Sequence, residues 1–441
     1  MNTIQDKVLG SWFGMAVGDA MGAAVRGLKP ATIAQCFRTV DGFKDVRPFL
    51  GRGIRHFKMQ GLYGWQTQMA LVVCETLLQH KNIELPDAAA GFQELSRGGP
   101  ETGFGVYRNP DAWFRKTVEA LARRDDPARA DEDVCGGAYL ALAVPMALYY
   151  RGRPGVIRER CLALCPMLTR SPVEWMGAAL TGFLIDRLLP LEIRPEESPA
   201  AALDGILPAA AAFCRETRTH LKTRLGDNMS EKECLALGGI FGLLEENSGR
   251  EELQELAGLI CRYASDFTRQ PVSHAAQGYT LTLLPLAVAT LLRAGKGFAP
   301  VLTSALNRGG EADRLGALTG ALAGALYGFS GIPRDWRAGL VNAGEIKSRG
   351  EALFAKRRPK TLKDLYDMES GLTFKECEGK RKHTPRKPKA AARKAPPPVP
   401  ASVAEETPVS KKDDPAQWRK YQKDKTKKKR DRRKNLGELF P

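Results

Sequence analysis

The sequence predicts an all-α fold followed by a strongly basic C-terminal tail. From about residue 5 to residue 340, alanine and leucine recur at three- and four-residue spacing, while alternating β-branched runs are scarce. The 441 residues contain ample apolar side chains for a large helical body with its own core. Glycine also recurs every fourth residue in segments 10–22 and 316–328, which places it on one helical face in each. These observations favour a helical bundle.

Nine segments are expected to form helices, with glycine and proline punctuating the chain between them. In chain order they are Asp6–Met21, Thr67–His80, Pro110–Arg123, Gly136–Arg151, Pro172–Leu189, Ser230–Glu246, Leu253–Ser265, Thr280–Ala294 and Leu315–Gly328. The longest apolar runs, Ala138–Tyr150 and Leu281–Leu292, are shorter than the roughly 20 residues that cross a bilayer, so we interpret them as buried helices. Short helices are expected after Trp336.

The two glycine ladders need a physical reason, because glycine inside a helix costs about 1 kcal/mol relative to alanine. Their members are Gly10, Gly14, Gly18 and Gly22 in the first, and Gly316, Gly320, Gly324 and Gly328 in the second. Close approach of another helix or of a ligand would explain them equally. Acidic residues beside the ladders, Asp19 in the first and Glu311 and Asp313 ahead of the second, favour a site.

Charge is concentrated at the C-terminal end. Of the formal net charge of +17, residues 380–441 contribute 21 Lys and Arg against 7 Asp and Glu, or +14, which leaves +3 for the first 379 residues. The low-complexity segment Arg381–Pro400 cannot bury enough apolar surface to fold alone and is expected to be a disordered linker. Such a tail is typical of attraction to nucleic acid or another polyanion rather than to a membrane.

Aromatic residues within the tail suit stacking on exposed bases, while the cations suit phosphate contact. A solvated charged end is the alternative interpretation. The candidate nucleic-acid residues are Trp418, Arg419, Lys420, Tyr421, Lys427, Lys428, Lys429, Arg430, Arg432 and Arg433.

Cysteine and histidine indicate neither a disulfide scaffold nor a zinc site. The nine cysteines include no CxxC pair, and the five histidines form no cluster with metal-ligand spacing. No secretory signal is apparent after Met1. We therefore expect a cytoplasmic protein.

Four segments, in the same order, resemble motifs of the ADP-ribosylglycohydrolase family, including its dinitrogenase-reductase-activating type. These segments are Val8–Gly22, Tyr63–Ala70, Gly136–Pro145 and Asn307–Arg314 with the helix that follows it. The resemblance covers about residues 6–340. It implies the orthogonal helical bundle of that family and a site that holds two magnesium or manganese ions through oxygen ligands.

The residues at the metal positions depart from the family pattern. Gly64, Trp65 and Gln66 stand where the family has Thr-Asp-Asp, so two carboxylates and a hydroxyl are replaced by one neutral amide oxygen. In the closing signature the first Asp is Glu311, the second is retained as Asp313, and the threonine is Arg314. Because hard dications need several oxygen ligands, we expect no metal and no other cofactor. Bound magnesium or manganese would be expected only if the chain were an active hydrolase.

Two acquired arginines suggest a replacement for the metal. Arg26 stands where the family has an acidic residue, and Arg314 follows the retained Asp313. We expect one of these guanidinium groups to pair with Asp313 and Glu311, since a bidentate arginine satisfies a buried carboxylate without metal. Arg314 pointing to solvent is the alternative. The candidate catalytic residues are Asp313, Glu311 and Asp19. The candidate ligand-binding residues are Gly136, Gly309 and Gly310, whose backbone N–H groups are expected to hold a diphosphate, and Arg26 and Arg314, which could meet phosphate directly.

The leading prediction is a family-like protein without the metal centre and without the family's de-ADP-ribosylating activity, which binds ADP-ribose or a related nucleotide or acts as a scaffold. A divergent active hydrolase and a nucleic-acid-binding protein that works through its tail are the alternatives. The expected organisation is a helical domain over 1–345, a short helical extension over 346–379 and the basic tail over 380–441. No membrane partner is expected.

Overall fold

The computed structural model describes residues 3–101, 103–123, 130–193, 198–203, 205–226, 231–247, 252–268 and 271–383. In these ranges there is no β-strand, only two isolated bridges, so the all-α prediction is confirmed. The α-helices are α1 Ile4–Ala23, α2 Pro30–Phe37, α3 Trp65–His80, α4 Leu85–Ser96, α5 Ala112–Leu121, α6 Ala143–Tyr149, α7 Pro154–Leu164, α8 Pro172–Leu188, α9 Pro199–Ala202, α10 Ile206–Leu225, α11 Glu231–Asn247, α12 Leu253–Ser265, α13 Thr280–Arg293, α14 Phe298–Leu306, α15 Ala312–Tyr327, α16 Arg334–Gly339, α17 Ala343–Ala355 and α18 Leu365–His383. Short 3-10 turns are Arg47–Phe49, Leu140–Leu142 and Cys165–Met167.

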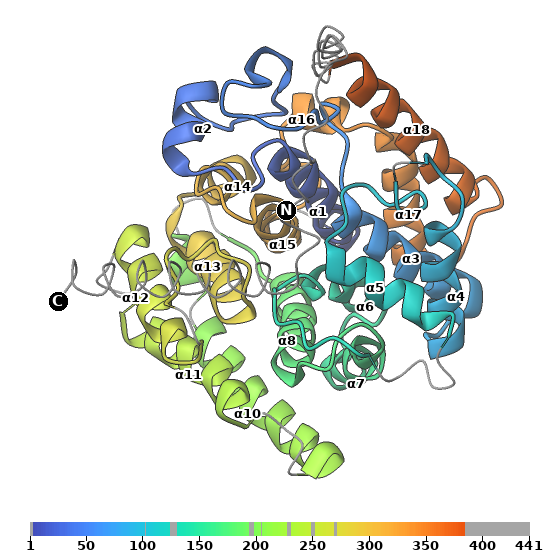
Figure 1. Cartoon of the computed structure of the whole chain (residues 1–441). Coiled ribbons are helices and arrows are strands. Elements are labelled where there is room, and N and C mark those ends of the chain that lie inside the picture. The colour runs from blue at the N-terminus through green and yellow to red at the C-terminus, as the bar shows by residue number, and fades with distance from the viewer. Residues whose placement is uncertain are drawn as a thin grey trace, which may run out of the picture. The chain divides into compact units, whose positions relative to one another are not determined.

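Helices α1 and α15 lie side by side at the centre of the bundle, with the other helices around them (Figure 1). They are antiparallel, and each glycine of one ladder faces the backbone of the other helix. A Cβ atom at Gly18 would overlap the Gly316 carbonyl, and one at Gly14 would overlap the Gly320 carbonyl. Contact between the two helices therefore accounts for the ladders without a ligand. The same contact brings the C-terminal end of α1 to the N-terminal end of α15.

One predicted helix is wrong over part of its length. The segment Gly136–Arg151 is helical only from the turn Leu140–Leu142 into α6. Gly137 has φ +64°, and the N–H groups of Gly137 and Tyr139 donate to the buried Glu174 carboxylate at 3.0 and 2.9 Å. The Glu174 side chain on α8 thus accepts hydrogen bonds from backbone N–H groups that the start of a helix would leave without partners.

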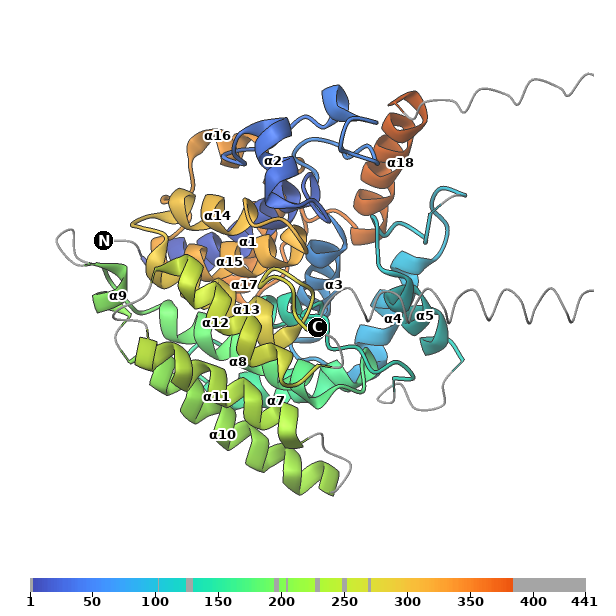
Figure 2. The ribbon, with the colours of Figure 1, turned by 60° about the vertical axis from the view of Figure 1, so that its left-hand side comes forward.

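Several helices are missing from the sequence-based prediction, among them α10 and α14. Both have a proline within the first turn, Pro208 and Pro300, where the absent N–H loses no helical hydrogen bond. Helices α10 and α11 pack against each other as a hairpin at one edge of the bundle (Figure 2).

The helices after residue 340 belong to the folded body. Helix α17 spans the expected boundary at 345, and α18 continues past 379 to His383. The described residues, from Thr3 to His383, all belong to one compact unit. The predicted tail residues from Trp418 to Arg433 lie outside the described residues. None of the helices in the described part of the chain is long and apolar enough to cross a membrane.

Helix α18 is anchored by a fully buried ion pair. Glu369 lies 2.6 Å from Arg108 Nη2, and it accepts hydrogen bonds from Tyr63 Oη at 2.6 Å and Gln68 Nε2 at 2.8 Å. Arg108 also donates to the Tyr63 carbonyl at 2.8 Å. The loop before α3 is therefore held between α18 and the Arg108 segment.

Gly18→Ala is expected to lower the free energy of unfolding by about 3 kcal/mol, because the new methyl group meets rigid backbone. Urea unfolding measures this change. Gly242→Ala in α11 is the matched control, since nothing lies within 4 Å of its Cβ position and alanine there should stabilise by up to about 1 kcal/mol. Equal effects in the two variants would contradict the packing explanation.

Glu369→Gln is expected to cost about 3–5 kcal/mol, because Arg108 would keep its charge in a buried position without a counter-ion. The control is Glu351→Gln, which removes an exposed ion pair with Lys347 and should cost under about 1 kcal/mol. Chemical denaturation of both variants tests this. A similar small loss in both would show that α18 is not anchored by this pair.

Candidate functional site

The candidate site lies where the end of α1 meets the start of α15. The turn after α1 carries Arg26, and the start of α15 carries Glu311, Asp313 and Arg314. Two backbone hydrogen bonds fix this junction: Gly27 N–H donates to the Gly310 carbonyl at 2.7 Å, and Gly310 N–H donates to the Leu28 carbonyl at 3.0 Å.

Five charged side chains form a cluster at this junction, which we call the ion cluster: Arg26, Asp111, Glu311, Asp313 and Arg314. Arg26 lies 3.2 Å from Asp313 Oδ2 and 3.4 Å from Glu311 Oε2. Arg314 lies 3.4 Å from the same Glu311 oxygen. Asp111 bridges the two arginines, with one carboxylate oxygen bonded to each. The pairing expected from the sequence is present, with both arginines taking part.

The cluster is mostly shielded from solvent, and its arginines differ in exposure. The side chains of Asp313 and Arg314 are 4% and 6% exposed, against 20% for Arg26 and 27% for Glu311. Burial alone would lower the pKa of Arg26, but the Asp313, Asp111 and Glu311 carboxylates outweigh it and raise that pKa. Arg26 is thus a permanent cation that still reaches solvent.

Arg314 is held in place from several sides. Its Nη1 donates to the Gly136 carbonyl at 2.8 Å. Its guanidinium also lies 5.8 Å from the ring centre of Trp65 and 5.6 Å from that of Trp113, within the range of cation–π attraction. Trp65, at one of the degenerate metal positions, therefore supports an arginine.

Asp19 lies behind the ion cluster and is fully buried. Its Oδ2 accepts hydrogen bonds from Gly64 N–H at 3.0 Å, Thr67 N–H at 2.9 Å and Thr67 Oγ1 at 2.7 Å. Its Oδ1 is buried without a hydrogen-bond partner among the described residues. Burial raises the pKa of Asp19 to about 6, and the neighbouring Asp313 carboxylate acts in the same direction. The pKa of the Asp19 carboxyl group therefore lies well above the ordinary value for aspartate.

The residues present do not fit a pair of divalent metal ions. A magnesium or manganese ion needs several oxygen ligands, whereas the carboxylates of the ion cluster already face two guanidinium groups that would repel a dication. Of the degenerate positions, Gly64 offers no side chain and Gln66 is 1% exposed. In the described ranges no group of three or more His, Cys, Asp or Glu side chains is arranged to hold a metal ion.

The expectation that Gly309 and Gly310 present free N–H groups to a diphosphate is wrong. Gly309 N–H donates to the Leu306 carbonyl at 3.2 Å, and Gly310 N–H is used in the junction with Leu28. Both glycines have positive φ, +66° and +62°, and they approach other backbone segments closely. Gly136 contributes a carbonyl rather than an N–H to the site. Arg26 and Arg314 are therefore the candidate ligand-binding residues that remain.

Sequence reasoning missed the residue at the centre of the ion cluster. Asp111 precedes α5 as its N-cap residue, and nothing in its local sequence indicates that two arginines converge on it. It also missed Thr67, Trp113 and the half-buried Lys58, whose pKa burial lowers to about 8. The Asn109-Pro110-Asp111 signal for a helix start was the one available hint.

The fold and the site together define an all-α protein whose polar centre lies where its first helix meets a late glycine-rich helix. A family model described as ADP-ribosylglycohydrolase matches residues 1–363. The chain therefore belongs to the ADP-ribosylglycohydrolase family. The match ends before α18, which lies outside it.

Similar proteins agree with this assignment. The ADP-ribosyl-[dinitrogen reductase] glycohydrolase of Rhodospirillum rubrum is 25% identical over 356 residues, which cover 80% of this chain and 97% of that protein. ADP-ribosylhydrolase ARH3 of Xenopus tropicalis is 23% identical, with 78% and 93% covered. A solved structure described as an ADP-ribosylglycohydrolase-related protein complex has a TM-score of 0.56 and 22% identity, covering 81% of this chain and all of its own. At that identity the structural likeness shows the fold.

Asp19→Asn is expected to change how stability depends on pH. Because the raised pKa favours the protonated form in the folded state, wild-type stability falls as pH rises from about 4 to about 6, and the uncharged variant lacks this loss. The free energy of unfolding of the variant minus that of the wild type should therefore increase by about 3 kcal/mol over this interval. Unfolding at a series of pH values measures it. A difference that stays constant would show that the pKa of Asp19 is unperturbed.

Proposed function

We propose that this chain is a metal-independent member of its family that binds ADP-ribose or a related nucleotide without the hydrolysis that its relatives are named for. The observation that carries the proposal is the ion cluster, in which two guanidinium groups pair with the three carboxylates. Hydrolysis with metal-positioned substrate and water needs ligands that this site lacks. In the weaker form of this proposal, the helical domain acts as a scaffold.

Arg26 is the group that supports binding of an anionic ligand. Its side chain is 20% exposed, whereas Arg314 is almost fully buried between aromatic rings. A guanidinium matches the bidentate geometry of phosphate oxygens. A diphosphate could therefore meet Arg26 at the surface of the ion cluster while Arg314 keeps the carboxylates in place.

A divergent hydrolase is the second candidate, and Asp19 is the observation that favours it. A carboxyl group with pKa near 6 and one buried oxygen without a partner suits proton transfer at neutral pH. In such a hydrolase Asp313 and Glu311 would hold Arg26 and Arg314 in position, and these arginines would orient the substrate. The substrate class would follow two similar proteins, the Rhodospirillum rubrum glycohydrolase named for an ADP-ribosylated protein and the ADP-ribosylarginine hydrolase Tri1 of Serratia proteamaculans.

A third candidate places the function in the basic tail, which would bind nucleic acid or another polyanion through phosphate contacts. Its support is the charge of residues 380–441. Affinity should fall steeply with salt.

Calorimetric titration of the full chain with ADP-ribose, in magnesium and in a chelator, tests the leading proposal. Equal binding in both conditions is expected, and Arg26→Gln should weaken it about tenfold or more because one charge-assisted hydrogen bond is lost. Arg224→Gln, on the exposed end of α10, is the matched control. Binding that requires magnesium, together with release of ADP-ribose from ADP-ribosylarginine, would favour the hydrolase.

Replacing both arginines should create a metal response. In the double variant Arg26→Gln and Arg314→Gln, the three carboxylates of the ion cluster lose their counter-ions and become available to Mn²⁺. We expect Mn²⁺ to raise the Tm of this variant by about 2–4 °C or more and to leave the wild type unchanged. Thermal unfolding with and without Mn²⁺ measures both. The same shift in the wild type would contradict replacement of metal by arginine.

A further inference from the structure

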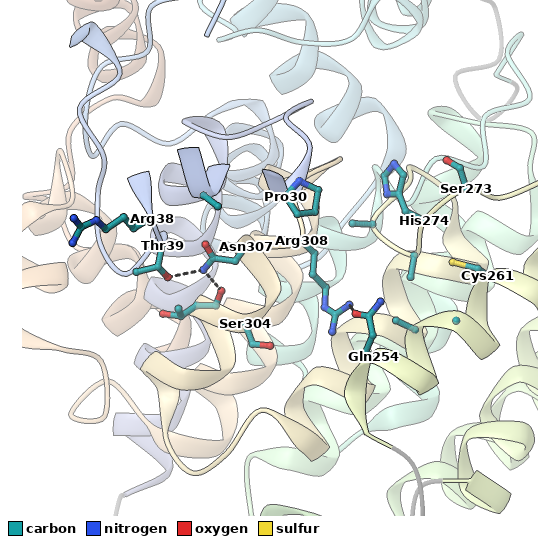
Figure 3. Close-up of a pocket in the computed structure, with 16 residues that line it drawn as sticks. Pro30, Arg38, Thr39, Gln254, Cys261, Ser273, His274, Ser304, Asn307 and Arg308 are labelled. Carbon is teal, nitrogen blue, oxygen red and sulfur yellow. Dashed lines mark hydrogen bonds between the residues drawn. The ribbon is translucent and has the colours of Figure 1, made fainter. Parts of the chain in front are cut away.

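A cavity lies beside Asn307 and Arg308, which directly precede the Gly309–Gly310 turn. Its volume is about 770 Å³, within the range of ligand pockets. Helices α2, α12 and α14 and the segment 273–276 form its walls, and none of the five ion-cluster residues lines it (Figure 3).

The lining carries positive charge and no carboxylate. Arg38 and Arg308 are its cations, and the His274 imidazole and amide and hydroxyl groups such as Gln254 and Ser304 complete its polar part. Arg38 lies at the edge of the cavity and points away from His274 and Arg308 (Figure 3). Arg308 is therefore the cation that faces the interior of the pocket.

Arg308 has few partners of its own. Its Nη1 donates to Gln254 Oε1 at 3.3 Å, and its Nε is buried without a partner in the described residues. No carboxylate pairs with it in this part of the chain. Burial lowers the pKa of Arg308, which is the direction expected for a cation with lost hydration and no counter-ion.

Such an arginine favours an anion from solution. A half-buried guanidinium without a counter-ion is costly, and a carboxylate or phosphate would offset that cost through two parallel hydrogen bonds. Pro30, Ala257, Ala275 and Ala276 supply apolar walls beside it. One inward-facing cation in a cavity of this size suits a ligand with one charged group and an apolar body.

We propose that this pocket binds a small organic anion, whose carboxylate or phosphate group pairs with Arg308 and whose apolar part lies against the alanine-lined wall. The site is separate from the ion cluster, but the two share a wall. The Ala276 carbonyl accepts a hydrogen bond from Glu311 N–H at 2.9 Å, and a Cβ at Gly310 would overlap His274. A ligand here therefore rests against the turn that leads into α15.

Calorimetry on the full chain with phenyl phosphate, benzoate and neutral benzamide tests this proposal. At least one of the two anions should bind about tenfold or more tightly than benzamide, and comparison of the two anions tells which oxyanion is preferred. Arg308→Gln should abolish that advantage, while Arg224→Gln should leave it unchanged. Equal binding of benzamide and the anions, or an unchanged affinity in Arg308→Gln, would overturn the proposal.

A second variant tests where the probes bind without changing Arg308 or any residue of the ion cluster. Ala34→Trp places a large ring at an exposed position of α2 that lines the cavity, so it should weaken the anions and benzamide alike. Arg26→Gln should not affect these probes, because Arg26 does not line this pocket. Loss of probe binding in Arg26→Gln with no loss in Ala34→Trp would place the anions in the ion cluster instead.

Discussion

Backbone contact between α1 and α15 is the constraint on which the rest of the structure depends. Glycine at every fourth position lets two helices approach until their carbonyl groups occupy the space of absent side chains. Because the helices are antiparallel, this contact sets the end of one against the start of the other. Asp19 and Arg26 reach the same place as Glu311, Asp313 and Arg314 for this reason alone, although almost three hundred residues separate them.

In the ion cluster, carboxylates are paired with arginines of the same chain. Carboxylates gathered at a helix start need cations close by, and here the chain supplies them covalently through Arg26 and Arg314. Aromatic rings and the Gly136 carbonyl hold Arg314, while α18, which lies beyond the family match, clamps the loop whose Gly64 and Thr67 bind Asp19. In this structure each carboxylate of the ion cluster is thus paired with an arginine.

The fold was predictable from sequence because glycine spacing and helical periodicity are local signals, and the family match confirms the resemblance drawn from four motifs. The pairing of Arg26 and Arg314 with Glu311 and Asp313 was also within reach, since Arg314 lies inside one of those motifs and Arg26 lies just after another. The place of Asp111 in the ion cluster was not predictable, because its partners come from other elements of the fold. The glycine N–H groups expected to bind phosphate are used by the junction itself, which no single segment reveals.

Titration of the purified full chain with Mn²⁺, followed by electron paramagnetic resonance of the free ion, tests the central claim most directly. If the two arginines have taken the place of the metal, free Mn²⁺ should rise in proportion to the amount added, with no saturable site tighter than millimolar. Stoichiometric binding of one or two ions at micromolar concentration would contradict the account, because the carboxylates would then be available to a dication despite their guanidinium partners.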